Sequence, residues 1–168
     1  MISDYIVQAF ITVMLCINYF ILIFLFPVFF AQKVTSPRRK PWLSLVFIIF
    51  FSVLAYALSF FIQDAWIGNR ILHILGGGFT AFLVCFLAAR DSRVVINKFQ
   101  FFVFSFLYVL SLGVANEIFE LILQTYFGII SSTTVDDTWL DLASNLSGLI
   151  IASVCFVPFH KKEALDHI

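Results

Sequence analysis

The chain has 168 residues and a formal net charge of zero; 62% of the residues are hydrophobic and only 12% are charged. An average soluble domain carries about 25% charged residues, and the mean hydropathy here is +1.04, so a soluble globular domain is excluded. The basic residues lie in short clusters between apolar runs and form no extended stripe, which argues against a nucleic-acid partner. The composition predicts an integral membrane protein.

Five apolar runs are each close to the ~20 residues that a helix needs to cross a ~30 Å hydrocarbon core. They cover residues 5–30, 43–62, 71–89, 99–126 and 139–158. Isolated runs can cross lipid only as helices, because each must satisfy its own backbone hydrogen bonds. We therefore predict an all-α, polytopic transmembrane helix bundle of five spans. No internal repeat or linker stands out, so residues 1–168 are predicted to form a single transmembrane domain.

The distribution of basic residues predicts the orientation of the bundle. Nine of the ten Lys and Arg residues follow the first, third or fifth run, and only Arg70 lies on the other side. By the positive-inside rule the N-terminus is outside and the C-terminus is cytoplasmic. On the first run, Gln8 and Thr12 lie four residues apart, so their shared helix face is predicted to look into the bundle.

Carboxylates inside membrane-length segments are energetically expensive, so their default interpretation is a functional site. On the fourth run, Glu117, Glu120 and Gln124 are spaced i, i+3, i+7, and Asn116 lies one turn from Glu120. This spacing places them along one helix face. Two carboxylates this close in a low dielectric are not expected to remain charged together without a positive partner.

The fifth run carries a second polar face. Asp137, Asp141, Asn145 and Gly148 follow one another at spacings of four, four and three residues, which predicts an inward-pointing face. Asp136 and Asp137 also precede a helix, where carboxylates cap free N–H groups, so capping or solvation stays open for these two. Asp141 and Asn145 lie inside the run, and a site role is the better interpretation for them.

The third run begins near Arg70 and His73 and continues with three glycines and Thr80. His73 and Gly77 are four residues apart, so the glycines would let a neighbouring helix approach closely beside the imidazole. In the predicted topology this histidine lies in the outer half of the bilayer, opposite the carboxylates of the fourth and fifth runs. It could serve as a ligand or acid/base group, or simply as a satisfied polar side chain, and both readings stay open.

Together these residues predict a site in the outer half of the membrane. The candidate catalytic groups, which are also the candidate ligands of a divalent cation such as Zn²⁺ or Mn²⁺, are His73, Glu117, Glu120 and Asp141. The candidate substrate-binding residues are Arg70, Asn116, Gln124, Asp137 and Asn145. The same set could instead relay protons or hold a polar head group, so the sequence leaves open whether the site is catalytic.

Short motifs in the last three runs resemble those of the VanZ-like membrane proteins and the related YjdF-like proteins. The matching elements are a histidine with glycines (His73, Gly76, Gly77), a Glu-x-x-Glu element (Glu117, Glu120) and an Asp-x-x-x-Asn-x-x-Gly element (Asp141, Asn145, Gly148). VanZ-like members tend to have Glu-x-x-Gln at the second element, so the YjdF-like proteins are more similar. The resemblance implies a small protein of the bacterial cytoplasmic (inner) membrane, and VanZ-like members are linked to glycopeptide resistance.

The leading hypothesis is a cell-envelope protein whose outer-leaflet site binds or modifies a polar lipid head group or a lipid-linked precursor, with a divalent metal as the candidate cofactor. One alternative is a small proton- or cation-coupled transporter, which would form a homo-oligomer because five helices enclose little volume. The other alternative is that the protein is a structural membrane subunit. The inner halves of the spans read as almost wholly apolar, with Cys85, Ser105 and Ser153 as weak exceptions, which favours a one-sided site over a path.

Overall fold

The computed structural model describes residues 2–32, 41–128 and 135–160, and this part of the chain consists of helices joined by short turns, with no strand. The elements are α1 (Ile2–Phe29), α2 (Pro41–Phe61), α3 (Ala65–Leu72), η1 (His73–Thr80), α4 (Ala81–Ser92), α5 (Lys98–Phe127), α6 (Val135–Phe156) and η2 (Val157–Phe159). Since α3, η1 and α4 follow one another without a break, they form one rod over Ala65–Ser92. Five helices are then long and apolar enough to cross a membrane, which confirms the predicted fold class.

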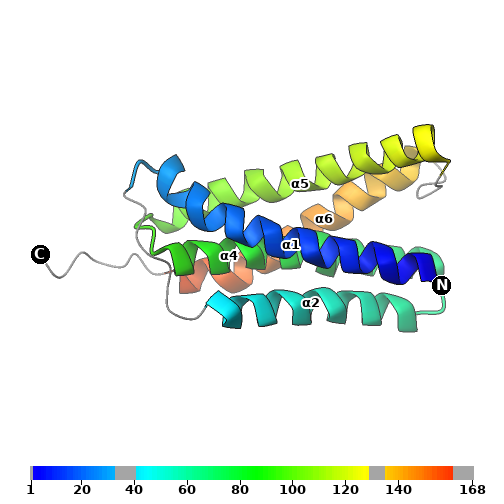
Figure 1. The fold of residues 1–168 in the computed structure, drawn as a ribbon, viewed down its shortest axis with the longest axis horizontal. Coiled ribbons are helices and arrows are strands. Elements are labelled where there is room, and N and C mark those ends of the chain that lie inside the picture. The colour runs from blue at the N-terminus through cyan, green and yellow to red at the C-terminus, as the bar shows by residue number, and fades with distance from the viewer. Residues whose placement is uncertain (1, 33–40, 129–134, 161–168) are drawn as a thin grey trace, which may run out of the picture.

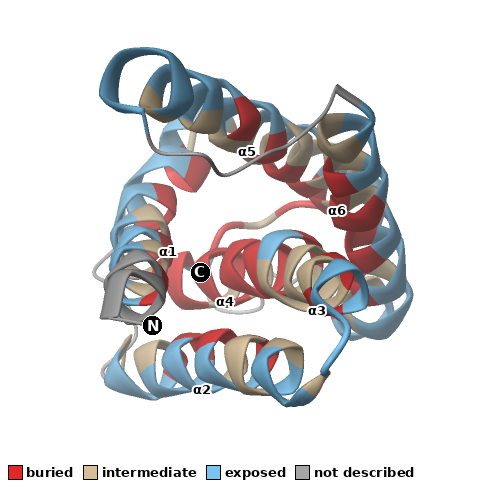
Figure 2. Cartoon of the chain, turned by 90° about the vertical axis from the view of Figure 1, so that its right-hand side faces the viewer, coloured by how far each residue is buried: buried red, intermediate tan, exposed pale blue. Residues whose placement is uncertain are grey.

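The rod formed by α3, η1 and α4 is the centre of the bundle, and α1, α2, α5 and α6 surround it (Figures 1 and 2). Half of its most apolar window is buried, against 22–28% for the other four spans. The outer helices turn large apolar side chains such as Val28, Phe50 and Val154 away from the protein. Such a surface would be an aggregation hazard in water, but it suits contact with lipid.

The ends of the bundle follow the predicted alternation of spans. α1 begins at the end where α5 finishes and α6 starts, and the α4–α5 connection lies at the opposite end (Figure 1). Six of the nine basic residues behind the orientation prediction, which are Lys33, Arg38, Arg39, Lys40, Lys161 and Lys162, lie outside the described residues. Which end faces the cytoplasm therefore stays a prediction. We call the end with the start of α6 the acidic end.

The third span begins six residues before the predicted residue 71. Asp64 has extended backbone angles, and its Oδ1 accepts hydrogen bonds from the backbone N–H groups of Trp66 (2.9 Å) and Ile67 (3.1 Å), which caps the helix start. The apolar run omitted this turn because it contains Asn69 and Arg70. Both residues are therefore held on a rigid helix.

A crossing of η1 with α6 brings two backbones into direct contact. A Cβ atom added to Gly77 or Gly78 would lie 2.0–2.1 Å from the Oδ1 or the backbone oxygen of Asn145, and one added to Gly148 would lie 1.9 Å from the Ile74 oxygen. The predicted close approach at the glycines is thus confirmed. η1 is a π-helix, a wider turn that is often found at functional sites. Its Thr80 hydroxyl donates to the Leu75 carbonyl at 2.6 Å.

The face of α1 that carries Gln8 and Thr12 looks into the bundle, as predicted. The Gln8 amide donates to the backbone oxygen and the hydroxyl of Ser52 on α2, both at 3.1 Å. The Thr12 hydroxyl lies 2.8 Å from the same Ser52 hydroxyl. These contacts join α1 to α2 by polar side chains within apolar surroundings.

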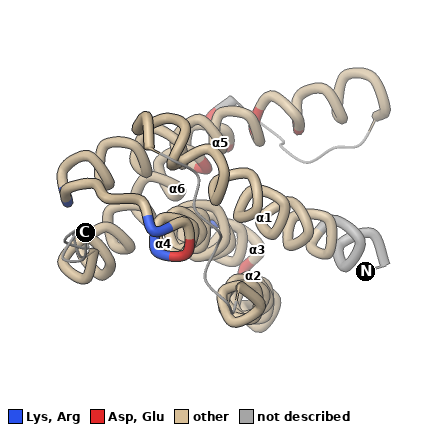
Figure 3. Tube along the Cα trace, turned by 60° about the vertical axis from the view of Figure 1, so that its left-hand side comes forward, with Lys and Arg blue, Asp and Glu red and all other residues tan. Residues whose placement is uncertain are grey.

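The end opposite the acidic end contains a buried charge that the sequence interpretation missed. Asp91 is 2% exposed, and its carboxylate accepts hydrogen bonds from Tyr19 (2.7 Å), from Ser44 and from Arg90 (3.0 Å). Figure 3 shows the acidic and basic residues side by side at the end of α4. The third span extends past the predicted residue 89 to Ser92, and Tyr19 of α1 and Ser44 of α2 bury a carboxylate that appears solvated in the sequence.

Replacing Tyr19 with phenylalanine is expected to lower the free energy of unfolding by about 1.5–3 kcal/mol, because a buried carboxylate would lose a hydrogen-bond donor. Thermal unfolding of the purified protein in mild detergent measures the effect. Tyr126→Phe is the matched control, since Tyr126 is 78% exposed. Equal unfolding temperatures for the two variants would contradict a stabilising role for the Tyr19–Asp91 contact.

Candidate functional site

Three side chains from three different helical elements meet near the acidic end. His73 opens η1, Glu117 lies on α5 and Asp141 lies on α6. Each offers one nitrogen or carboxylate oxygen, and these atoms lie within 4.8 Å of one another. Glu117 is 9% exposed and Asp141 is 1% exposed, so both carboxylates are withdrawn from the surface. These three are the residues among the candidate ligands that the structure brings into one group.

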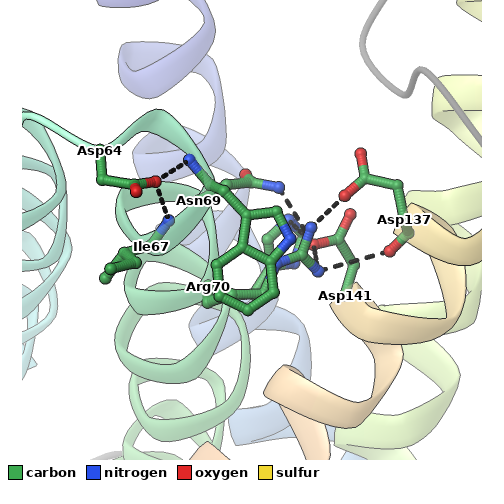
Figure 4. A network of polar contacts seen from close by, with 8 residues as sticks. Asp64, Ile67, Asn69, Arg70, Asp137 and Asp141 are labelled. Atoms are coloured by element: carbon green, nitrogen blue, oxygen red, sulfur yellow. Dashed lines mark hydrogen bonds and ion pairs between the residues drawn. The ribbon is translucent and has the colours of Figure 1, made fainter.

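Asp141 is the most heavily contacted member of the group. Its Oδ1 atom lies 2.6 Å from Arg70 Nη1, 3.2 Å from Asn69 Nδ2 and 3.2 Å from His73 Nε2. Figure 4 shows Asn69 and Arg70 reaching from α3 toward α6, where Asp137 and Asp141 lie one turn apart. The π-helical crossing is what allows η1 and α6 to present His73 and Asp141 to one another at this distance.

Arg70 joins the two aspartates of α6. Its guanidinium also pairs with the Asp137 carboxylate and donates to the Asp137 carbonyl at 3.4 Å. The guanidinium carbon lies 5.7 Å from the centre of the Trp66 ring, within the range of a cation–π contact. Arg70 is 8% exposed, so it is a nearly buried cation between carboxylates. Asp137 therefore has a specific partner in addition to its place at the start of α6.

Unsatisfied polar atoms are concentrated at this site. Four buried side-chain nitrogen or oxygen atoms lack a hydrogen-bond partner in the described part of the chain, and three of them are here: Arg70 Nε, Glu117 Oε1 and Asn145 Oδ1. A buried polar atom without a partner is unfavourable by about 1–3 kcal/mol, more for a charged group. Such groups usually have a role or bind a water or ion. Their clustering favours a ligand site over a set of contacts that only stabilises the bundle.

A cavity of about 360 Å³ lies beside the cluster. Within the described ranges, no Cα atom of α1 comes within 8 Å of one in α5, so this helix pair is separated along the cavity. Side-chain contacts bridge the separation: the stacked rings of Phe10 and Phe119, the hydrogen bond from Tyr108 to Asn18 (2.5 Å), and the packing of Phe104 against Phe26 and Phe29. His73, Glu120 and Asp141 line the cavity together with five amides, Gln8, Asn18, Asn69, Asn116 and Asn145.

The remaining predicted site residues occupy different positions. Asn116 donates to Glu120 at 2.7 Å, and both line the cavity, although Glu120 is not part of the three-residue group. Gln124 is exposed and does not line the cavity. Gln8 and Asn69 were not predicted as site residues. The sequence feature that could have identified Gln8 is its predicted position on the inward-facing side of the first run. Asn69 had no such feature, because it lies outside the predicted apolar run.

These observations define an integral membrane protein built as a five-helix bundle, with a cluster of one half-buried histidine and two buried carboxylates next to a cavity at one end. The chain belongs to the DUF2238 family of predicted membrane proteins, whose model matches residues 5–162. No curated protein and no solved structure matches the chain significantly. The family match supports a membrane protein family and does not by itself establish the resemblance to VanZ-like or YjdF-like proteins.

Proposed function

We propose that the protein binds the polar head group of a membrane lipid, or of a lipid-linked cell-envelope precursor, in the cavity between α1 and α5. The observation that supports this most directly is the cavity itself, which combines polar side chains from α1, α3, α5 and α6 with apolar walls. Its volume of about 360 Å³ is within the ~300–1,000 Å³ typical of small-molecule sites. A lipid is the ligand class that matches a polar cavity inside a lipid-facing bundle.

The lining of the cavity favours a head group that offers both donors and acceptors. Asn69, Asn116 and Asn145 carry amides that can donate and accept, which suits hydroxyl groups. Glu120 adds an acceptor suited to an ammonium or a sugar hydroxyl. The apolar part of the lining, including Met14 and Leu112, would contact the upper part of the lipid chain.

The predicted orientation places this site in the outer half of the membrane. Under that orientation the ligand is a lipid of the outer leaflet, and the resemblance to YjdF-like proteins suggests the bacterial cytoplasmic membrane. The pair formed by Phe10 and Phe119, 45% and 44% exposed, lies between α1 and α5 on the lipid-facing side. A lipid entering from the bilayer would pass beside these rings.

Glu120→Gln is expected to weaken head-group binding roughly tenfold or more, because a hydrogen bond to a charged group contributes about 1.5–3 kcal/mol. The measurement is lipid retention: the protein is purified in mild detergent from a bacterial host, and the bound lipids are identified by mass spectrometry. Asp136→Asn is the matched control, since this exposed carboxylate lies at the same end of the bundle. Equal lipid retention by wild type and Glu120→Gln would overturn the proposal.

A cation or proton carrier is the second candidate function, and the buried Asp91 cluster is the observation that favours it. A transport path needs polar groups at both depths, and Asp91 supplies one at the end opposite His73. Between them, however, the core contains fully buried apolar side chains such as Phe82 and Val84. Flux into proteoliposomes that disappears in Asp91→Asn would favour transport over head-group binding.

A further inference from the structure

The geometry points to a divalent transition-metal ion bound by His73 Nε2 and the carboxylates of Glu117 and Asp141, with Zn²⁺ as the probe of choice and an open coordination position toward the cavity. This inference deepens the proposed function at the same site. It rests on that function only for the fourth ligand, which would be an oxygen of the lipid head group.

The spacing of the ligand atoms fits a small tetrahedral ion. Zinc bonds to imidazole nitrogen and carboxylate oxygen are about 2.0–2.2 Å long, so two such ligands at a tetrahedral angle lie about 3.4 Å apart. His73 Nε2 and Asp141 Oδ1 are 3.2 Å apart. A Glu117 oxygen completes a group in which every separation is within 4.8 Å.

Glu117 supplies a second, independent observation. It is 9% exposed, and its buried Oε1 atom has no hydrogen-bond partner among the described residues. A carboxylate withdrawn from water in this way is expected to have a cationic or hydrogen-bonding partner. The neighbouring cation, Arg70, is engaged by Asp137 and Asp141. A metal ion would provide a partner for Oε1, in addition to the contacts that Asn116 and Thr138 make with the same carboxyl group.

The charge of the site also favours a cation. Asp141 interacts electrostatically with Arg70 and with three further carboxyl groups, those of Asp137, Glu117 and Glu120. One guanidinium thus faces four carboxyl groups in a region of low dielectric. Unpaired charges there are strongly unfavourable, and a divalent ion would balance most of the excess.

Arg70 and Asn69 leave Asp141 able to bind a metal. The hydrogen bonds from Asn69 and Arg70 both end on Oδ1, and an ionised carboxylate has further lone pairs with which it can bind an ion beside them. His73 Nε2 would exchange its contact with Oδ1 for a bond to the same ion. Second-shell donors of this kind hold metal-binding carboxylates in position. His73 and Asp141 both line the cavity, so the free coordination position faces it. A head-group phosphate or hydroxyl oxygen would occupy that position, and the ion would polarise it as a Lewis acid.

The test measures metal content and metal-dependent stability in the full-length chain. Protein without a polyhistidine tag is purified in mild detergent, incubated with Zn²⁺, freed of excess ion and analysed by elemental mass spectrometry. Wild type is expected to retain about one zinc per chain and to unfold at a higher temperature with Zn²⁺. Glu117→Gln and His73→Gln are expected to lose both effects. Asp136→Asn, which removes an exposed carboxylate from α6, is expected to keep both.

The outcomes separate this inference from the proposed function. If wild type retains no more zinc than Glu117→Gln, the metal site is overturned. Lipid retention then stands as a separate result. Zinc that is retained by Glu120→Gln and lost by Glu117→Gln supports the three-ligand set. If Glu117→Gln or His73→Gln aggregates, wild type alone provides the test. Its unfolding temperature is measured with Zn²⁺ and with a chelator, and the absence of a rise with Zn²⁺ overturns the inference.

Discussion

Gly148→Ala is expected to disrupt the close packing of η1 against α6. The new Cβ would lie 1.9 Å from the Ile74 oxygen, 2.8 Å from its carbonyl carbon and 3.0 Å from the Phe79 nitrogen. These are backbone atoms of a helix, so no side chain can rotate away. Overpacking of this kind usually costs ~1–3 kcal/mol and occasionally more, and here η1 and α6 would have to separate. We expect a large loss of monodisperse protein and an unfolding temperature lowered by several degrees.

The control for this prediction is a glycine of the same stretch with room for a methyl group. At Gly76 an added Cβ would meet nothing nearer than 3.7 Å, which is ordinary van der Waals contact. Gly76→Ala should therefore express and unfold like wild type. Because the crossing also sets the distance from His73 to Asp141, any Gly148→Ala that folds should lose zinc as well. An unfolding temperature for Gly148→Ala equal to that of Gly76→Ala would show that the backbones are not in contact.

The five spans could be predicted because hydropathy responds to the same physics that makes a helix stable in lipid. Each run is long enough to cross the membrane, and within lipid only a helix satisfies its backbone. The start of the third span was the exception. Asn69 and Arg70 are polar, so the apolar run excluded them, yet α6 supplies carboxylates that pair with both. Partners from a distant part of the sequence made the polar turn tolerable.

The candidate site was predictable in outline, because helical periodicity assigns residues to faces. It placed Glu117 on α5 and Asp141 on α6 near His73, and the structure brings these three side chains together. Periodicity could not distinguish Glu117 from Glu120, since residues three apart share a face. The structure distinguishes them: Glu117 is buried, whereas Glu120 is half-buried at the cavity.

Two features had no usable signal in one sequence. The π-helical turn of η1 depends on the hydrogen-bonding register of the backbone, and three consecutive glycines are equally compatible with an α-helix. Asp91 stands between Arg90 and Arg93 at the end of a span, in a segment that resembles an ordinary solvated loop. Its burial comes from Tyr19 and Ser44, which are 72 and 47 residues away along the chain. Only tertiary packing reveals such a contact.

Arg70→Gln is expected to destabilise the protein by about 3–5 kcal/mol, the usual effect of removing one partner from a buried ion pair. The substitution would leave Asp137 and Asp141 without the guanidinium that pairs with both, while Glu117 and Glu120 remain nearby. Thermal unfolding in detergent at neutral pH and without added metal gives the measurement. Arg93→Gln is the matched control, because Arg93 is exposed and directly follows α4, at the end of the bundle opposite Arg70. This substitution should change the unfolding temperature little.

The double variant Arg70→Gln/Asp141→Asn distinguishes electrostatics from packing. If the loss in Arg70→Gln comes from uncompensated carboxylate charge, then removing the Asp141 charge as well should restore part of the stability, and the two substitutions will not be additive. Added Zn²⁺ should likewise rescue Arg70→Gln, because the ion supplies the positive charge that the arginine no longer provides, and it should rescue the double variant less. Additive losses with no rescue by zinc would mean that Arg70 stabilises the bundle through its contacts with Trp66 and the α6 backbone, and not by balancing the acidic cluster.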